Sequence, residues 1–186
     1  LNLIGDHNVR NATAAIAIAL NLGVKVNKIK SALKKFLGIQ RRFTKVFSIK
    51  KREFFDDYAH HPTEVKAVLK AAREVYKNRK IICVFQPHRY SRVKYLRNEF
   101  SSAFRLSDQV LLCPVYSAGE KKKYNFNQDN FSRLISKKSS IQVINVKDKK
   151  ELSSFFKKNL LEDEVVICMG AGSISNWIRE IGNESK

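Results

Sequence analysis

The sequence of 186 residues has few of the residues that mark secreted or zinc-binding proteins. It contains three cysteines, three prolines, one methionine and one tryptophan. Cys83, Cys113 and Cys168 are too few and too scattered for a disulfide framework or a CxxC metal site. Each lies in an apolar run, so we expect reduced thiols in the core, which suits a cytoplasmic protein.

Long apolar runs are also missing from the sequence. No uninterrupted apolar stretch approaches the roughly 18 residues of a membrane-spanning helix, so no membrane partner is expected. The first residues lack the basic start and the long apolar centre of a signal peptide. They lack an initiator methionine as well, which suggests that the chain is a fragment.

Two common catalytic motifs are absent. The sequence has no GxxxxGK[ST] phosphate-binding loop and no GxSxG turn of the kind that hydrolases use. The glycine-rich residues 170–173 do not form a complete GxGxxG, because Ser175 holds the place of the third glycine. A dinucleotide site is therefore poorly supported, and the alternative is that these glycines allow a tight turn or a close backbone approach.

Acidic residues are scarce, with 17 Asp and Glu against 36 Lys and Arg, and the net charge is +19. Such a charge favours anionic partners such as nucleotides, nucleic acid or anionic lipid. The lysines are spread along the chain and do not form one stripe interleaved with aromatic residues. We therefore favour a solvated, lysine-rich surface and do not expect specific nucleic-acid binding, but a basic nucleic-acid-binding module remains the alternative.

The pattern of apolar residues changes near residue 40. Before it, helices are expected at residues 11–22 and 26–37, ended by Gly23 and Gly38. After it, strands at residues 43–49 and 53–56 flank a basic turn, and helices then alternate with strands. The later helices are expected at residues 62–77, 92–106, 127–137, 149–159 and 173–181, and the later strands at residues 80–85, 109–113, 141–146 and 164–169.

This alternation predicts βαβ units and a mostly parallel sheet. The runs at residues 81–85 and 165–169 are apolar on both faces, as a sheet covered by helices on both sides requires. The predicted fold class is α/β, with a doubly wound, mostly parallel, Rossmann-like sheet over residues 40–186. A short helical piece of another domain, residues 1–39, precedes it. Within the helix at residues 92–106, the side chains expected to face inward are Tyr95, Leu96, Phe100 and Phe104.

Unusual polar residues fall just after the predicted strands. They occupy four loops, at residues 56–62, 86–92, 114–120 and 170–173. In an open parallel sheet the carboxyl ends of the strands lie along one edge, and ligands bind in crevices there. We therefore expect the four loops to converge on one site.

Charged side chains in these loops indicate what the site binds. His88, Arg89 and Arg92 together can hold a carboxylate or a phosphate, and open amide groups at the start of the following helix would add to anion binding. Asp56 and Asp57 allow three readings, namely a metal site, acceptors for ribose hydroxyls, or a turn and helix cap.

The pair His60-His61 raises the possibility of zinc. Adjacent side chains diverge, however, and no cysteine or second histidine pair has the spacing of a zinc site. We favour a histidine that orients a substrate, beside Pro62 in the first turn of a helix.

Five motifs, spread in order over most of the chain, resemble those of the Mur ligases. They are Gly5-Asp6-His7-Asn8-Val9-Arg10-Asn11-Ala12, Arg41-Arg42-Phe43, Asp56-Asp57-Tyr58-Ala59-His60-His61-Pro62-Thr63-Glu64, Phe85-Gln86-Pro87-His88-Arg89-Tyr90-Ser91-Arg92 and Tyr116-Ser117-Ala118-Gly119-Glu120. The resemblance implies an ATP-dependent enzyme of peptidoglycan synthesis that joins L-alanine to UDP-N-acetylmuramate. Such ligases phosphorylate the substrate carboxylate, and the amine attacks the resulting acyl phosphate.

The family has three domains, and the resemblance covers the end of the central ATPase domain and the whole C-terminal, amino-acid-binding domain. The phosphate-loop lysine and most ligands of Mg²⁺ would lie upstream, so no metal ligand is expected within this chain. The fragment is expected to be inactive without the missing N-terminal and central domains.

The resemblance also implies roles for individual residues. His7, Asn8 and Asn11 would line the adenine pocket of the ATP site, Arg42 would reach a nucleotide phosphate, and Asp57 would meet the ribose hydroxyls. Tyr58, His60, His88, Arg89 and Arg92 would form the L-alanine pocket, and among them His60, His88 and Arg89 would be catalytic.

Overall fold

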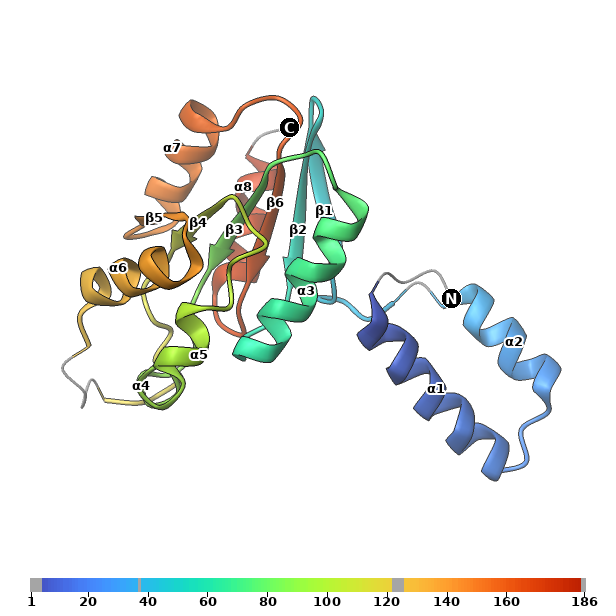
Figure 1. Ribbon diagram of the computed structural model, residues 1–186. Helices are drawn as coiled ribbons and strands as arrows, with labels where there is room; N and C mark the ends of the chain where they lie inside the picture. Colours follow the sequence, from blue (N-terminus) through green and yellow to red (C-terminus); the bar gives the residue numbers. More distant parts are fainter. Residues whose placement is uncertain (1–4, 37, 122–125, 185–186) are drawn as a thin grey trace. The chain divides into compact units, whose positions relative to one another are not determined.

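The computed structural model describes residues 5–36, 38–121 and 126–184. The chain divides into two compact units, Leu1–Gln40 and Arg41–Lys186. The first unit is a pair of helices, α1 (Asp6–Asn21) and α2 (Val26–Lys35), shown in blue in Figure 1.

The helix α1 begins at Asp6, five residues earlier than expected. An acidic side chain in the first turn suits the positive end of the helix dipole, which favours this earlier start. Gly23 follows α1 with a φ of 75°, a left-handed conformation that glycine adopts without strain. The predicted helix end at that glycine is therefore confirmed.

The second unit is an α/β domain. Its strands are β1 (Thr44–Ile49), β2 (Arg52–Asp57), β3 (Ile81–Phe85), β4 (Gln109–Leu112), β5 (Gln142–Asn145) and β6 (Val165–Met169). Its helices are α3 (Pro62–Val75), α4 (Tyr90–Tyr95), α5 (Arg97–Ser101), α6 (Gln128–Ser139), α7 (Lys149–Asn159) and α8 (Ile174–Asn183).

The strands form one six-stranded sheet in the order β1-β2-β6-β3-β4-β5. β1 pairs with β2 antiparallel, and every other neighbouring pair is parallel. The doubly wound, mostly parallel sheet predicted from the sequence is confirmed. Because β2, β6, β3 and β4 run parallel, their carboxyl ends lie at one edge, which is where the polar loops begin.

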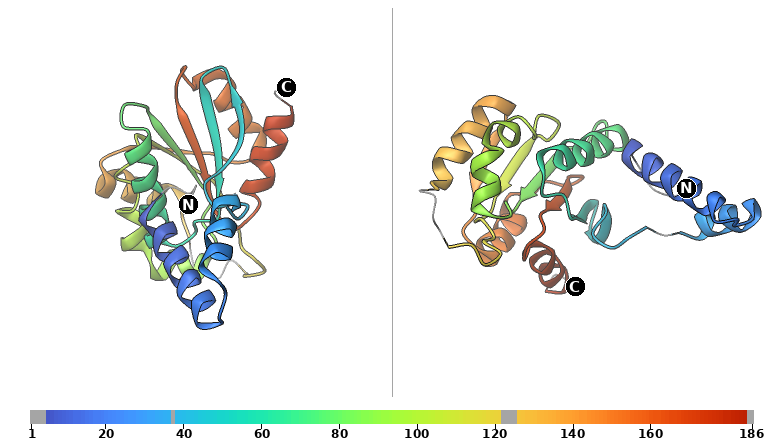
Figure 2. Two further views of the ribbon diagram at one scale, coloured as in Figure 1. Left: turned by 90° about the vertical axis from the view of Figure 1, so that its right-hand side faces the viewer. Right: turned by 90° about the horizontal axis from the view of Figure 1, so that it is seen from below.

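Helices cover both faces of the sheet, as Figures 1 and 2 show. Ile81, Cys83 and Phe85 of β3 face a core with residues of α3, α5 and α6, whereas Ile82 and Val84 face a core with α7 and α8. This alternation follows from the two-residue period of a strand. It explains why the central strands are apolar at every position.

The predicted helix at residues 92–106 is wrong in two respects. The chain forms two short helices, α4 and α5, because Leu96 leaves the helical conformation with φ −107° and ψ 24°. Tyr95, which was expected to face inward, is 71% exposed, whereas Val93 and Phe100 are buried. In a continuous helix, Val93 and Phe100 would share one face and Tyr95 would lie off it; in the structure the two buried side chains come from the separate helices α4 and α5.

The three cysteines are free and buried, as expected. Burial raises the pKa of each thiol, in the case of Cys113 to about 12, so the thiols stay protonated. Among the residues that the structure describes, no helix is long and apolar enough to cross a membrane.

Candidate functional site

The polar loops meet at the carboxyl edge of the sheet, as the sequence predicts. Backbone hydrogen bonds join them beyond the ends of the strands: the amide of Gly170 donates to the carbonyl of Asp57 at 3.1 Å. The amide of Tyr116 donates to Pro87 and that of Arg89 donates to Tyr116, both at 2.8 Å. The amide of Gln86 donates to the carbonyl of Met169 at 2.9 Å, so the loops after β2, β6, β3 and β4 form one continuous rim.

Asp56 and Asp57 lie on opposite faces of β2, and both are buried. Asp56 points toward α8, where its Oδ2 accepts from Ser175 Oγ at 2.6 Å and from Arg179 Nη2 at 3.1 Å. It therefore anchors a helix to the sheet. Among the described residues, no group of His, Cys, Asp and Glu side chains is arranged to hold a metal ion.

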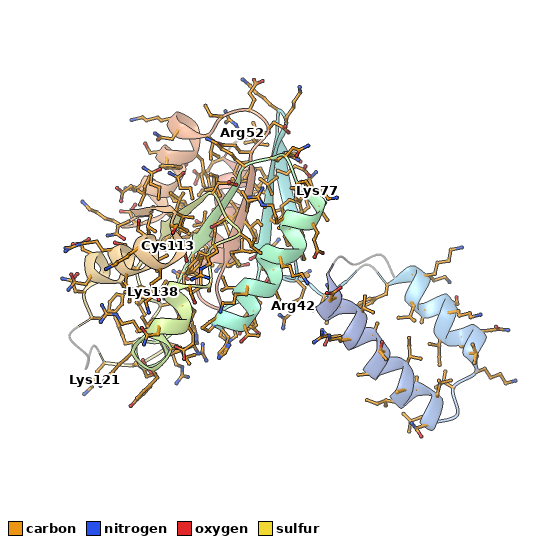
Figure 3. All side chains as sticks on the ribbon, in the orientation of Figure 1. Arg42, Arg52, Lys77, Cys113, Lys121 and Lys138 are labelled. Carbon is orange, nitrogen blue, oxygen red and sulfur yellow. The ribbon has the colours of Figure 1, made fainter. Side chains whose placement is uncertain are left out.

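Asp57 faces the other side and fixes the backbone around the rim. Its Oδ1 accepts from the amide of Ala59 at 2.7 Å, and its Oδ2 accepts from the amide of Phe43 at 2.8 Å. Burial raises the pKa of Asp57 to about 6, against the opposing effect of these two amides and of the nearby Arg42 charge. Arg42 is itself exposed, and Figure 3 shows it near the carboxyl end of β2, with Arg52 at the opposite end.

Four rings form a row across the rim. The ring centroids of Tyr58 and His60 are 5.1 Å apart, and those of His60 and His88 are 5.7 Å apart. The centroids of His88 and Tyr116 are also 5.7 Å apart, with nearly parallel planes. The row brings together three side chains that the resemblance places in one pocket, and it adds Tyr116, which the sequence alone did not assign to it.

The two histidines in this row have different hydrogen-bond partners. His60 Nδ1 lies 2.9 Å from the carbonyl oxygen of Tyr58, whereas His88 Nδ1 lies 3.1 Å from Arg92 Nη1. Partial burial lowers the pKa of His88, and the neighbouring Arg92 charge adds to this effect. His88 is therefore a neutral imidazole at neutral pH.

The side chain of His61 caps the N-terminus of α3. Its Nδ1 accepts from the amide of Thr63 at 3.3 Å, and Glu64 Oε2 accepts from the amide of His61 at 3.1 Å. This reciprocal pair is a capping box at the start of the helix. His61 is therefore a helix cap, whereas His60 belongs to the row of rings across the rim.

The prediction of open amides at the start of α4 is wrong. Glu120 Oε2 accepts from the amide of Ser91 at 3.1 Å, and the Ser91 hydroxyl donates to Glu120 Oε1. The bonds from Ser91 hold the pKa of Glu120 below its ordinary value, so this carboxylate already fills the anion position. Arg89, in contrast, is exposed, with a left-handed φ of 69° at the N-cap of α4. It remains available for an anionic ligand.

The glycine-rich turn after β6 provides close backbone approach. A Cβ on Gly172 would lie 2.5 Å from both Gln86 Oε1 and Tyr116 Cγ. The buried side chain of Gln86 also bonds this turn, since Nε2 donates to Ser173 Oγ and Oε1 accepts from the amide of Ile174, each at 3.0 Å. Of the two readings, the structure favours a packing role for these glycines.

Matches to known proteins identify the family. The family model described as "Mur ligase, glutamate ligase domain" matches residues 41–172. This chain belongs to the Mur ligase family. A UDP-N-acetylmuramate–L-alanine ligase of Pelagibacter ubique is 49% identical to it over 181 residues, which are 97% of this chain and 39% of the relative.

Two further matches agree. A UDP-N-acetylmuramate–L-alanine ligase of Fusobacterium nucleatum is 40% identical over 195 residues, covering 99% of this chain and 40% of the relative. The crystal structure of the UDP-N-acetylmuramate–alanine ligase of Thermotoga maritima has a TM-score of 0.78 and 31% identity, and the match covers 99% of this chain and 39% of that chain. The chain thus spans about two fifths of the length of the curated relatives it matches.

Membership of the Mur ligase family leaves the nucleic-acid-binding alternative without support. The surface charge is consistent with this outcome, because the exposed Lys77, Lys121 and Lys138 are at separate places on the second unit (Figure 3).

The residues predicted to bind adenine belong to the first unit. Asn8 is half-buried and Asn11 is exposed, and they are one turn apart in α1. The side chain of His7 is outside the described part of the chain. The structure therefore leaves the predicted adenine contacts of this Mur ligase chain as predictions.

Arg41 belongs to the rim, and the Arg41-Arg42-Phe43 motif gave it no role in the sequence analysis. Its Nη2 donates to the carbonyl of Gly170 at 2.7 Å, and its guanidinium lies 4.6 Å from the centroid of the Tyr58 ring. Its Nε lies 3.9 Å from Asp56 Oδ2. Arg41 therefore fixes the ring of Tyr58 relative to the turn after β6.

Proposed function

We propose that this chain is the C-terminal part of an ATP-dependent ligase that joins L-alanine to UDP-N-acetylmuramate through an acyl phosphate. The observation that carries the proposal is the rim at the carboxyl edge, where His60, His88 and Arg92 are neighbours and Arg89 is exposed beside them. The names of the relatives support the choice of L-alanine and UDP-N-acetylmuramate as substrates.

The rim suits a small zwitterion. An amino-acid carboxylate needs cationic donors, and the guanidinium groups of Arg89 and Arg92 supply planar forks for it. Tyr58, His60 and His88 form the wall beside these arginines, and Arg41 holds Tyr58 in place. Holding the amine beside the activated carboxyl group converts a collision between two molecules into a reaction within one complex.

The ATP contacts that the resemblance to the Mur ligases implies are part of this proposal. His7, Asn8 and Asn11 are proposed for adenine, Arg42 for a phosphate and Asp57 for the ribose hydroxyls. The buried carboxylate of Asp57 already accepts two backbone amides, so its remaining lone pairs would serve the ribose. Arg42 is exposed next to it and so fits a phosphate contact. When bound, ATP supplies the phosphoryl group that activates the carboxylate, and the ligands of Mg²⁺ are expected upstream.

A fused ligase tests this function. It joins the part of the Pelagibacter ubique relative that precedes the matched region to residues 1–186 of this chain. With ATP, UDP-N-acetylmuramate and L-alanine, we expect phosphate release and one L-alanyl product, measured by mass spectrometry.

Each separate part serves as a control, and neither is expected to ligate alone. A folded fused ligase that makes no L-alanyl product, or that prefers an unrelated acceptor, would overturn the proposal.

A further inference from the structure

The partners of His60 and His88 fix where each ring carries its proton. A backbone carbonyl can only accept a hydrogen bond, so His60 Nδ1, 2.9 Å from the carbonyl of Tyr58, must be protonated. A guanidinium can only donate, so His88 Nδ1, 3.1 Å from Arg92 Nη1, must be unprotonated. The two rings therefore have opposite tautomers.

A neutral imidazole carries one N–H, so the other nitrogen of each ring is determined as well. His60 Nε2 has a free lone pair, and His88 Nε2 carries a hydrogen. The ring centroids are 5.7 Å apart with a steep angle of 66° between the planes. The pair thus offers one acceptor and one donor on neighbouring rings.

We propose that His60 Nε2 takes a proton from the ammonium group of the amino-acid substrate and that His88, as a neutral ring, donates from Nε2 to the substrate carboxylate. The inference rests on the proposed function, because it assigns roles within the same pocket. It assigns His60 as the general base and His88 as a binding residue.

Two protons leave the substrate nitrogen during the reaction. The ammonium group gives one proton to His60 and becomes a nucleophilic amine, while the imidazole becomes an imidazolium. The amine nitrogen forms a bond to the acyl carbon, the bond from that carbon to the phosphate oxygen breaks, and phosphate leaves with the electron pair. The second proton of the nitrogen goes to the leaving phosphate, and His60 returns its proton to water.

The charges around His60 suit this task. Glu64 Oε2 lies 3.4 Å from His60 Nδ1, so a carboxylate faces the imidazolium as it forms. The other groups that face this ring are Tyr58 and His88, and Arg92 contacts the Nδ1 atom of His88. Partial burial and the Arg92 guanidinium beside Nδ1 both lower the pKa of His88, so a proton is disfavoured on that ring and only His60 is left to act as the base.

The tautomers can be measured on this chain without any activity. Long-range ¹H–¹⁵N NMR spectra distinguish the protonated from the unprotonated ring nitrogen, and the chain has only four histidines. At a pH well above the ordinary histidine pKa of about 6.5, we expect a protonated Nδ1 in His60 and a protonated Nε2 in His88. His61 is the internal reference, because its Nδ1 accepts from Thr63 and its Nε2 must be protonated. A protonated Nε2 in His60 overturns the inference.

Kinetics of the fused ligase test the roles. His60→Asn keeps an N–H that can reach the carbonyl of Tyr58 but removes the base, so kcat should fall by about 10²–10⁴-fold. Because the parent enzyme supplies its own base, its rate should level off at alkaline pH. The rate of the variant should keep rising with pH as free amine accumulates in solution.

Two variants serve as controls. His88→Gln keeps a donor near the position of Nε2 and should raise the KM for L-alanine while leaving the shape of the pH profile unchanged. His61→Asn replaces one helix cap with another and should change neither kcat nor the profile. If His60→Asn retains the parent profile while the parent fused ligase makes the L-alanyl product, the inference fails and the proposed function stands. If the parent makes no product, the proposed function fails.

Discussion

Gly172 offers a quantitative test of how the rim is packed. A methyl group on this residue would lie 2.5 Å from Gln86 Oε1 and 2.5 Å from Tyr116 Cγ, both well inside van der Waals contact. Gly172→Ala therefore forces the turn or the two side chains to move. Overpacking of this kind costs about 1–3 kcal/mol of unfolding free energy. For a domain of this size, we expect the melting temperature to fall by roughly 2–4 °C for each kcal/mol.

The assay is thermal and urea unfolding of the chain, followed by circular dichroism, for Gly172→Ala with and without Tyr116→Ala. Because Tyr116→Ala removes the Cγ atom that would lie 2.5 Å from the new methyl group but keeps the Cβ that would lie 2.7 Å from it, the cost of Gly172→Ala should be only partly reduced in that background, a coupling that a double-mutant cycle measures. If Gly172→Ala leaves the stability of the parent unchanged within about 0.5 kcal/mol, the close approach of the turn to Gln86 and Tyr116 is refuted.

Three further predictions concern binding and pH. In the fused ligase, Arg89→Ala and Arg92→Ala should each raise the KM for L-alanine about 10–150-fold, since each removes a charge-assisted contact of about 1.5–3 kcal/mol; steady-state rates at varied L-alanine check this, and an unchanged KM contradicts the pocket. Burial raises the pKa of Asp57 from 3.8 to about 6, so the folded state keeps a proton that the unfolded state releases. The unfolding free energy of the parent should therefore fall, relative to Asp57→Asn, as pH rises from about 4 to about 6, and urea unfolding over this range that shows a constant difference would refute it. Asn11→Ala should raise the KM for ATP and leave that for L-alanine unchanged, and equal effects on both would argue against the adenine assignment.

Most of the fold follows from local sequence pattern. The runs at residues 81–85 and 165–169 are apolar throughout, and only a strand in a covered parallel sheet needs both faces apolar, so β3 and β6 could be predicted. The break between α4 and α5 could not, because no glycine or proline marks Leu96. The exposure of Tyr95 could have been foreseen from the face that Val93 and Phe100 would share in a continuous helix.

The site was predictable as far as the position of its loops. The sequence places polar residues after parallel strands, and topology alone brings those strand ends together. The opposite directions of Asp56 and Asp57 follow from the period of a strand, but only once β2 is known to extend to Asp57. The contacts of Arg41 with Gly170 and of Glu120 with Ser91 join distant parts of the sequence, and no local pattern announces them.

The most direct test of the central claim is a crystal structure of the fused ligase with L-alanine, UDP-N-acetylmuramate and a non-hydrolysable ATP analogue. We predict that the carboxylate of L-alanine lies within hydrogen-bond distance of Arg89 or Arg92, with its nitrogen facing His60. L-Alanine bound away from the four loops, with both guanidinium groups turned to solvent, would contradict the account.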